Sequence, residues 1–297
     1  MTHNDLHPKN NARAWSKELG ELAGGASGGF LLGVPLLYTM EVWFIGSHVQ
    51  PPRLLGILAV TYAIVFLLNR VEGFRDSHRE GWLDAAAESV EALAIGIVCA
   101  AGMLVVLQKI TLQTSFNEAL GKITFESVPF ALGVALSRSI LSGDRWLSSN
   151  SPTSERKKHP KRQGLRQETL SDMSATSIGA VIIAFNIAPT DEVPVLAAAA
   201  SPPWLLVIIA VSLLISYGIV FASGFTDQAK RRQQQGLFQG PLSETVFSYL
   251  VSLGASALML WFFQQLSLSD PWELWLRYTL ILGLPATVGG AAGRLAV

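Results

Sequence analysis

Two glutamates in matching surroundings are the residues of this chain best suited to do chemistry. Glu41 follows Thr39, and Glu192 follows Thr190 and Asp191, in stretches that are otherwise largely apolar. A carboxylate at the centre of a bilayer costs about 2.5 kcal/mol or more to insert, so ionisable residues that are kept there usually serve a function. We predict that both glutamates belong to one ion- or proton-binding site shared between two halves of the protein.

The chain around the second glutamate is suited to interrupting a helix. Pro189 and Pro194 bracket this glutamate, and prolines remove backbone donors and disfavour a continuous helix. Interrupted helices beside polar residues are where transporters expose backbone carbonyls to ions. Hard oxygen ligands of this kind suit H⁺, Na⁺, Ca²⁺ or Mn²⁺. The predicted binding residues are Glu41, Glu192, Asp191, Thr39, Thr190 and Asn186.

Apolar stretches long enough to cross a bilayer must position these residues. Half of the residues are hydrophobic and only 15% are charged, which is unusual for a soluble domain, and a spanning helix takes about 20 residues. We therefore predict an all-α integral membrane protein with eight transmembrane helices. The expected spans are 26–47, 53–72, 86–107, 124–142, 174–198, 203–225, 243–265 and 274–296, with 111–123 a candidate interfacial helix.

An internal repeat relates the two halves of the chain. Residues 28–76 align with 179–227 without a gap, and Glu88, Pro129 and Gly133 align with Glu244, Pro285 and Gly289. Matching charged residues and prolines inside spans are much less expected by chance than matching apolar residues. Because each unit has an even number of spans, both units enter the membrane in the same direction. We predict two tandem parallel four-helix repeats with pseudo-two-fold symmetry about the membrane normal.

The distribution of Lys and Arg predicts the orientation of the chain. These residues gather in the N-terminal segment, the central linker and alternate loops, so the positive-inside rule places both termini in the cytoplasm. We expect a multi-pass protein of the cell inner membrane. Its predicted parts are a cytoplasmic N-terminal segment (1–25), membrane repeat one (26–142), a basic cytoplasmic linker (143–172) and membrane repeat two (173–297).

A second set of charged residues lies near the cytoplasmic ends of the spans. Glu88 with Arg138, and Glu244 with Arg294, are placed to form ion pairs or solvated helix ends, and a structural role is the interpretation we favour for them. Glu91 lies three residues after Glu88, so it falls on the same helix face one turn deeper.

Several classes of function find no support in the sequence. It contains no H-E-x-x-H, Walker A or G-x-G-x-x-G motif, its histidines lie in tails or loops, and Cys99 is its single cysteine. We expect no enzymatic activity, no cofactor and, with a net charge of zero, no nucleic-acid partner. The expected partners are the lipid bilayer and a cation or proton. The identity of any metal and association into a homo-oligomer are left open.

The segments GVPLLYTMEVW (33–43) and APTDE (188–192) also carry a family resemblance. The chain resembles a bacterial family of integral membrane proteins that carry a domain of unknown function, over nearly its whole length. This resemblance implies a multi-pass membrane protein. It implies no established activity and therefore no site residues.

Two interpretations of function follow from the residues. The first is a transporter or channel for a cation or protons that uses intramembrane carboxylates at the interface of the two repeats. The alternative is a non-transporting membrane sensor or assembly module whose acidic residues are structural, with a basic linker that docks a partner or anionic lipid. The sequence does not distinguish a channel from an exchanger, nor does it give the ion, the direction or the coupling.

Overall fold

The computed structural model describes residues 8–71, 81–141, 165–222 and 241–295, and this part of the chain is helical and contains no strand. The first half consists of α1 (Pro8–Leu37), α2 (Met40–His48), α3 (Pro51–Val71), α4 (Trp82–Val106), α5 (Phe116–Ala135) and α6 (Ser137–Leu141). The second half consists of α7 (Leu165–Ile187), α8 (Glu192–Ala199), α9 (Pro202–Ala222), α11 (Pro241–Phe262) and α12 (Trp272–Leu295). The all-helical fold is therefore confirmed.

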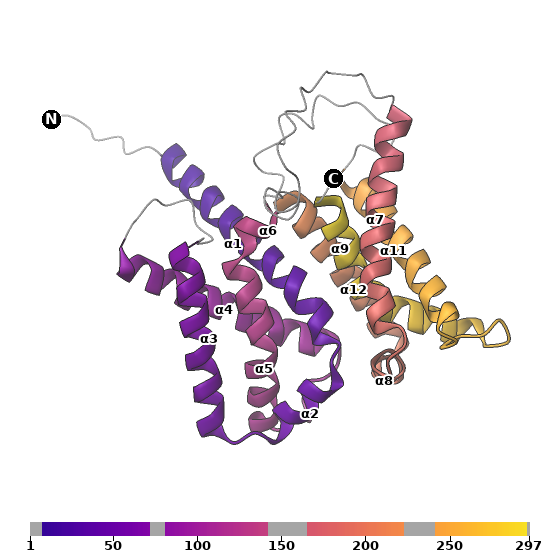
Figure 1. Cartoon of the computed structure of the whole chain (residues 1–297), viewed down its shortest axis with the longest axis horizontal. Helices are drawn as coiled ribbons and strands as arrows, with labels where there is room; N and C mark the ends of the chain where they lie inside the picture. The colour runs from indigo at the N-terminus through magenta and orange to yellow at the C-terminus, as the bar shows by residue number, and fades with distance from the viewer. Residues whose placement is uncertain (1–7, 72–80, 142–164, 223–240, 296–297) are drawn as a thin grey trace, which may run out of the picture.

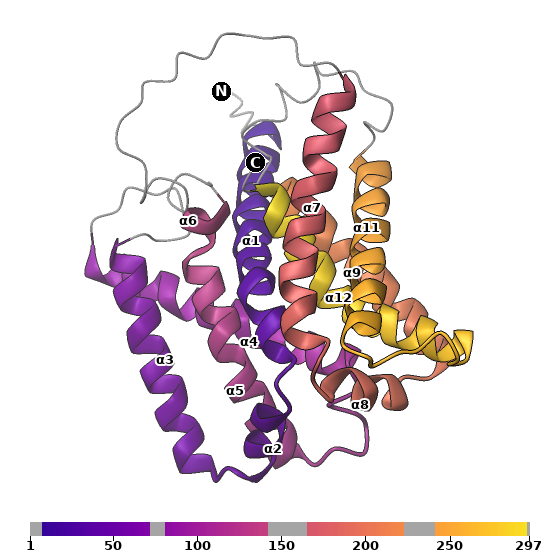
Figure 2. The ribbon, with the colours of Figure 1, turned by 45° about the vertical axis from the view of Figure 1, so that its right-hand side comes forward.

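The two halves lie beside each other, and α1 of the first half packs against α9 and α12 of the second (Figures 1 and 2). One hydrophobic core runs through both halves, since Val34 and Leu104 belong to the same buried cluster as Ile219 and Leu284. The buried core is thus continuous across the junction between the halves.

The described residues supply four helices that are long and apolar enough to cross a membrane, namely α3, α4, α9 and α11. The bent pairs α1–α2 and α7–α8 raise this number to six if each pair forms one span. The eight expected spans are therefore supported only in part. Helices α5 and α12 fall outside the set, although both are long enough.

Burial explains how α5 and α12 can be less apolar than the four candidate spanning helices. Each is packed against several helices of its own half, and residues 280–291 of α12 form an unbroken buried stretch. Helices inside a membrane bundle meet protein rather than lipid, and small residues let them pack closely. A helix buried against protein in this way can therefore carry polar residues that lower its mean hydropathy.

Both bent pairs break at aligned places in the sequence. The two helices of each pair are bent by 91° at a break of a few residues. At the first break the Thr39 hydroxyl donates to the carbonyl of Leu36 at 2.8 Å, and at the second the Thr190 hydroxyl donates to the carbonyl of Ile187 at 2.7 Å. Each threonine thus satisfies a carbonyl at the end of the preceding helix.

The turns that follow α4 and α11 also share one conformation. Gln108 has a φ of 56° and Gln264 a φ of 59°, in the left-handed region that commonly ends a helix. In each turn the N–H of the next residue donates to the carbonyl five residues back, at 2.8 Å after α4 and 2.9 Å after α11. The two turns therefore use the same backbone hydrogen bonds.

Equivalent glycines mark the closest helix crossings in the two halves. A Cβ atom on Gly28 of α1 would clash with the carbonyl of Gly133 of α5, and one on Gly133 would clash with the carbonyl of Gly28. Gly179 of α7 and Gly289 of α12 form the same mutual contact. Small residues at such crossings allow the two backbones to touch.

Several element boundaries differ from those expected. α1 begins at Pro8 and so includes most of the expected N-terminal segment, and α7 begins at Leu165, inside the expected linker; residues 142–164 lie outside the described part. The stretch 111–123 is not a separate interfacial helix, because α5 starts at Phe116. The Ser115 side chain accepts from the Glu118 N–H at 3.3 Å, a capping arrangement that begins the helix there.

Candidate functional site

Glu192 lies where the two helix breaks meet. It is the first residue of α8, and it is only 7% exposed. Its Oε1 accepts a hydrogen bond from the backbone N–H of Met40, the first residue of α2, at 3.2 Å. The carboxyl group therefore lies at the N-termini of two helices from different halves, where the helix dipoles favour a negative charge.

The other oxygen of the same carboxyl group is available to a ligand. Oε2 of Glu192 is buried and has no hydrogen-bond partner among the described residues. A buried acceptor without a partner costs about 1–3 kcal/mol. A proton or a cation bound at this oxygen would remove that cost and would neutralise the carboxylate.

The other predicted binding residues surround this contact, but their side chains are exposed or have local partners. Glu41 directly follows Met40 and is exposed, as is Asp191 directly before Glu192. The two threonines are half-buried and donate within their own helix breaks. Asn186 is exposed, and its amide donates to a carbonyl one turn back in α7 at 2.8 Å. The structure thus brings the two breaks together around Glu192, with Asn186 further back on α7.

Two more hydrogen bonds join the halves close to the breaks. The buried Tyr38 hydroxyl donates to the carbonyl of Ile281 at 2.7 Å. Pro285, four residues further along α12, has no N–H, so this carbonyl lacks its usual helical partner. In the second of these bonds, the indole N–H of Trp204 in α9 donates to the carbonyl of Val106, the last residue of α4, at 2.7 Å.

Glu126 of α5 is a buried carboxyl that sequence reasoning missed. It is 1% exposed, and its Oε1 has no hydrogen-bond partner among the described residues. The Trp43 indole of α2, which donates to the carbonyl of Leu37 at 2.9 Å, lies beside it. The sequence prediction considered acidic residues that occur at aligned positions in both halves. Glu126 aligns with Leu282 and was therefore passed over. The available signal was a single carboxylate inside the predicted fourth span.

Two lysines lie on the side of Glu126 that faces the loop before α5: Lys122 on α5, and Lys109 in the loop itself. The Lys122 Nζ donates to Glu118 Oε1 at 2.5 Å and to the carbonyl of Lys109 at 3.0 Å. The Lys109 ammonium lies 4.3 Å from the centre of the Trp43 ring, a cation–π contact. Burial, and then the charge of Lys122, lower the pKa of Lys109.

The structure describes only some of the charged residues predicted near the cytoplasmic ends of the spans. Arg294 forms an ion pair with Glu244 at the end of the second half. Glu88 and Glu91 are half-buried on α4. The side chain of Arg138 lies outside the described part of the structure, so its pairing with Glu88 stays a prediction.

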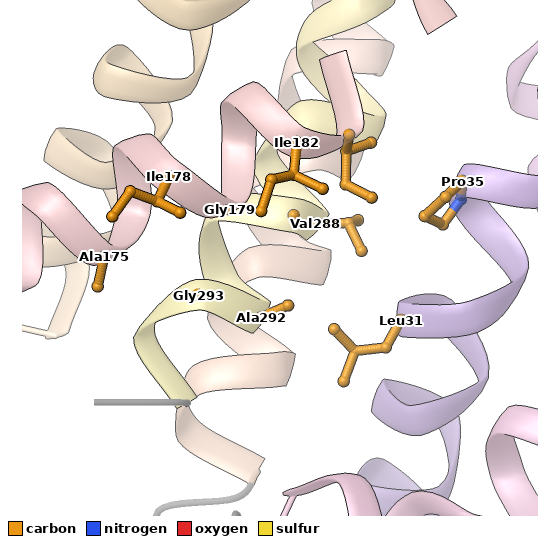
Figure 3. A pocket seen from close by; sticks show the side chains of 11 residues that line it. Leu31, Pro35, Ala175, Ile178, Gly179, Ile182, Val288, Ala292 and Gly293 are labelled. Carbon is orange, nitrogen blue, oxygen red and sulfur yellow. The ribbon is translucent and has the colours of Figure 1, made fainter. Parts of the chain in front are cut away.

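A cleft of about 350 Å³ opens between α1 of the first half and α7 and α12 of the second (Figure 3). Leu31 and Pro35 of α1 face Ile182, Val288 and Ala292 across it (Figure 3). Apolar side chains and glycines form its whole lining, so the cleft is chemically separate from the carboxyl of Glu192. The described residues also contain no group of three or more His, Cys, Asp or Glu placed to hold a metal ion.

Nearly the whole chain matches one known protein family. The model of a family described as "Putative integral membrane protein (DUF2391)" matches residues 21–297. No curated protein and no solved structure matches the chain.

Proposed function

We propose that this chain, which belongs to the integral membrane protein family matched above, moves protons or a cation across the bilayer. It is a multi-pass membrane protein in contact with lipid. The observation that carries the proposal is the carboxyl of Glu192. It is buried where the halves meet, accepts from the N–H of Met40, and has one oxygen that finds no partner in the described part of the chain. The proposal assigns no enzymatic activity.

We also propose that the chain crosses the membrane eight times, as two tandem parallel four-helix units with α5 and α12 as their inner helices. The equal bends of 91°, the matched turns after α4 and α11, and the matched glycine crossings support this arrangement. The units correspond to 26–142 and 173–297. The Lys and Arg distribution supports an inner-membrane location with cytoplasmic termini and a cytoplasmic linker.

A bound proton or cation would offset the cost of burying this carboxylate between the two halves. An isolated charge in a medium of low dielectric is strongly unfavourable, so a buried carboxylate binds a proton or a counter-ion. Two helix N-termini reduce this cost without abolishing it, because each contributes only about half an elementary charge. The remaining preference for a positive partner is what a transport site needs.

Substituting Glu192 with Gln tests this role. The Gln side chain keeps an oxygen that accepts from the Met40 N–H, so it preserves the link between the halves and removes only the charge. We expect Glu192→Gln in proteoliposomes to lose the flux of the transported ion while its unfolding temperature stays near that of the wild type. A screen with H⁺, Na⁺, K⁺, Ca²⁺ and Mn²⁺ identifies the ion.

Glu273→Gln is the matched control, because Glu273 is an exposed carboxylate at the start of α12 and should leave the flux unchanged. The alternative function, a non-transporting sensor or assembly module, draws on the same contact, since the Met40–Glu192 hydrogen bond joins the two halves. Wild-type flux in Glu192→Gln would reject the transport role of this residue. If Glu192→Leu then loses stability while Glu192→Gln does not, the structural alternative is favoured.

A further inference from the structure

We propose that Glu126 is a second proton-binding carboxyl, and that Glu118, Lys122 and Glu126 form a path along α5 that brings protons to it from one side of the membrane. This inference rests on the function proposed above and deepens it, because it selects the proton among the candidate ions. It also replaces the symmetric pair of Glu41 and Glu192 by an asymmetric pair, Glu126 and Glu192.

The three residues of the path follow one face of α5 and become more buried along it. They are spaced four residues apart, so they lie one above the other on the helix. The side chain of Glu118 is 35% exposed and that of Lys122 10% exposed, and Glu126 is 1% exposed. Polar groups thus lead from the loop that joins α4 and α5 to a fully buried carboxyl.

The far end of the path reaches α2, the helix whose first backbone N–H donates to Glu192. Trp43 lies beside Glu126, and Met40, three residues earlier in α2, donates its N–H to Glu192. Residues three apart lie on neighbouring positions of one helix surface. Helix α2 therefore contacts both buried carboxyl groups, and each of them has an oxygen without a partner in the described residues.

The other elements packed on α5 bring few charges close to Glu126. Lys109 comes from the preceding loop and is held through its carbonyl by Lys122. α4 already contacts Ala131 through Gly96, so Glu91 of the same helix lies further toward the opposite end. α2 presents Gly46 to Lys122 and Trp43 to Glu126. Helix α3 also packs on α5, and its first turn carries the exposed Arg53 at the end of the bundle from which the path starts. The charged groups in contact with the path itself are Lys109, Lys122 and Glu118.

This set of charges favours a proton over a metal cation. A metal cation that moved along the path would approach the ammonium groups of Lys122 and Lys109, and like charges repel strongly where water is scarce. A proton instead adds to a carboxylate: the Lys122 ammonium gives one proton to Glu126, which becomes a neutral acid, and the resulting amine takes a proton from the carboxylic acid of Glu118, which is refilled from the water at the loop. When the proton leaves toward Oε2 of Glu192 through intervening water, Glu126 returns to the carboxylate.

The second half of the protein lacks this path. The residues aligned with Glu118, Lys122 and Glu126 are Leu274, Tyr278 and Leu282. The two halves share their bends, turns and glycine contacts. The loss of all three polar residues from the matching face of α12 is therefore a local difference and not part of a general divergence between the halves. It also supplies a natural substitution for the test, since Leu occupies the position of Glu126 in the other half.

The experiment measures proton flux in proteoliposomes of the full-length protein with a pH-sensitive dye inside. We expect Glu126→Gln and Glu126→Leu to reduce flux to the level of empty liposomes, and Glu126→Asp to keep a part of it. Glu273→Gln should match the wild type. Because Leu fits this position in the other half, Glu126→Leu should fold even if Glu126→Gln does not.

The outcomes separate this inference from the function on which it rests. Proton flux that is lost in Glu192→Gln but retained in both Glu126→Gln and Glu126→Leu overturns the role of Glu126 and leaves the proposed function in place. Flux of a metal cation without protons overturns the proton path alone. If the wild type moves no ion, both proposals fail. Infrared difference spectra give an independent readout: Glu126→Gln should lose one of the protonated-carboxyl signals of the wild type, while the signal of Glu192 remains and is lost only in Glu192→Gln. A carboxyl region that is unchanged in Glu126→Gln contradicts proton binding by Glu126.

Discussion

At the scale of the residue, the bond between Tyr38 and Ile281 shows how the two halves are held together. Pro285 frees a carbonyl in α12, and the Tyr38 hydroxyl from the break in the first half satisfies it. We expect Tyr38→Phe to lower the free energy of unfolding by about 1–3 kcal/mol, because a buried acceptor is left without a donor. Unfolding of the detergent-solubilised protein by a denaturing detergent measures the change.

A double-mutant cycle checks the cause. In Pro285→Ala the helix regains an N–H for the carbonyl of Ile281, so the added Tyr38→Phe substitution should cost much less than it does in the wild type. An equal cost in both backgrounds would show that the hydroxyl stabilises the fold in another way.

Sequence reasoning at this scale depended on duplication, and this was both its strength and its weakness. It identified Glu192, which the structure places at the junction of the halves with one free oxygen. It gave Glu41 equal weight, although Glu41 is exposed. The orientation of a side chain around its helix depends on packing between elements distant in the sequence. For the same reason Glu126, which has no acidic counterpart, was missed.

At the scale of the element, the prolines show how well the local sequence predicts where a helix breaks. Pro189 lies in the break between α7 and α8, as the sequence predicted, whereas Pro194 fits inside α8. In the first half Pro35 lies inside α1, and the helix breaks only after Leu37. Proline weakens a helix locally, while packing against neighbouring helices decides where the chain turns.

The glycine crossings give a prediction for single elements. Gly179→Ala should lower the free energy of unfolding by about 1–3 kcal/mol, because the added methyl group would clash with the carbonyl of Gly289 and force α7 and α12 apart. Gly254 of α11 has open space around it, so Gly254→Ala should be neutral or should stabilise by up to about 1 kcal/mol. Equal effects of the two substitutions in thermal unfolding would argue against close packing at the crossing.

At the scale of the whole molecule, the direction in which each half enters the membrane can be measured. Leu112 and Leu268 occupy aligned positions in the two matched turns, and they are 107% and 87% exposed. If the halves are parallel repeats, single cysteines at both positions, in a background without Cys99, will react with a membrane-impermeant maleimide from the same side. With cytoplasmic termini, that side is the outside of intact cells.

Labelling of the two positions from opposite sides would make the repeats inverted rather than parallel. The pattern of even spans and alternating positive loops predicted the parallel arrangement from the sequence alone. It could not predict that α1 provides most of the contacts between the two halves among the described residues, because such contacts depend on how the two halves dock.

If α5 crosses the membrane as proposed, the depth of Glu126 makes proton binding there respond to voltage. This residue lies about 15 Å from the start of α5, which is about half of the roughly 30 Å thickness of the hydrocarbon layer. A proton that reaches it has therefore moved through about half of the transmembrane electric field, worth about 1 kcal/mol for each 100 mV. The second half has Leu282 at the aligned position, so hyperpolarisation would fill or empty a single titrating position in the pair, and a charge movement recorded across a planar bilayer that contains the protein would register it.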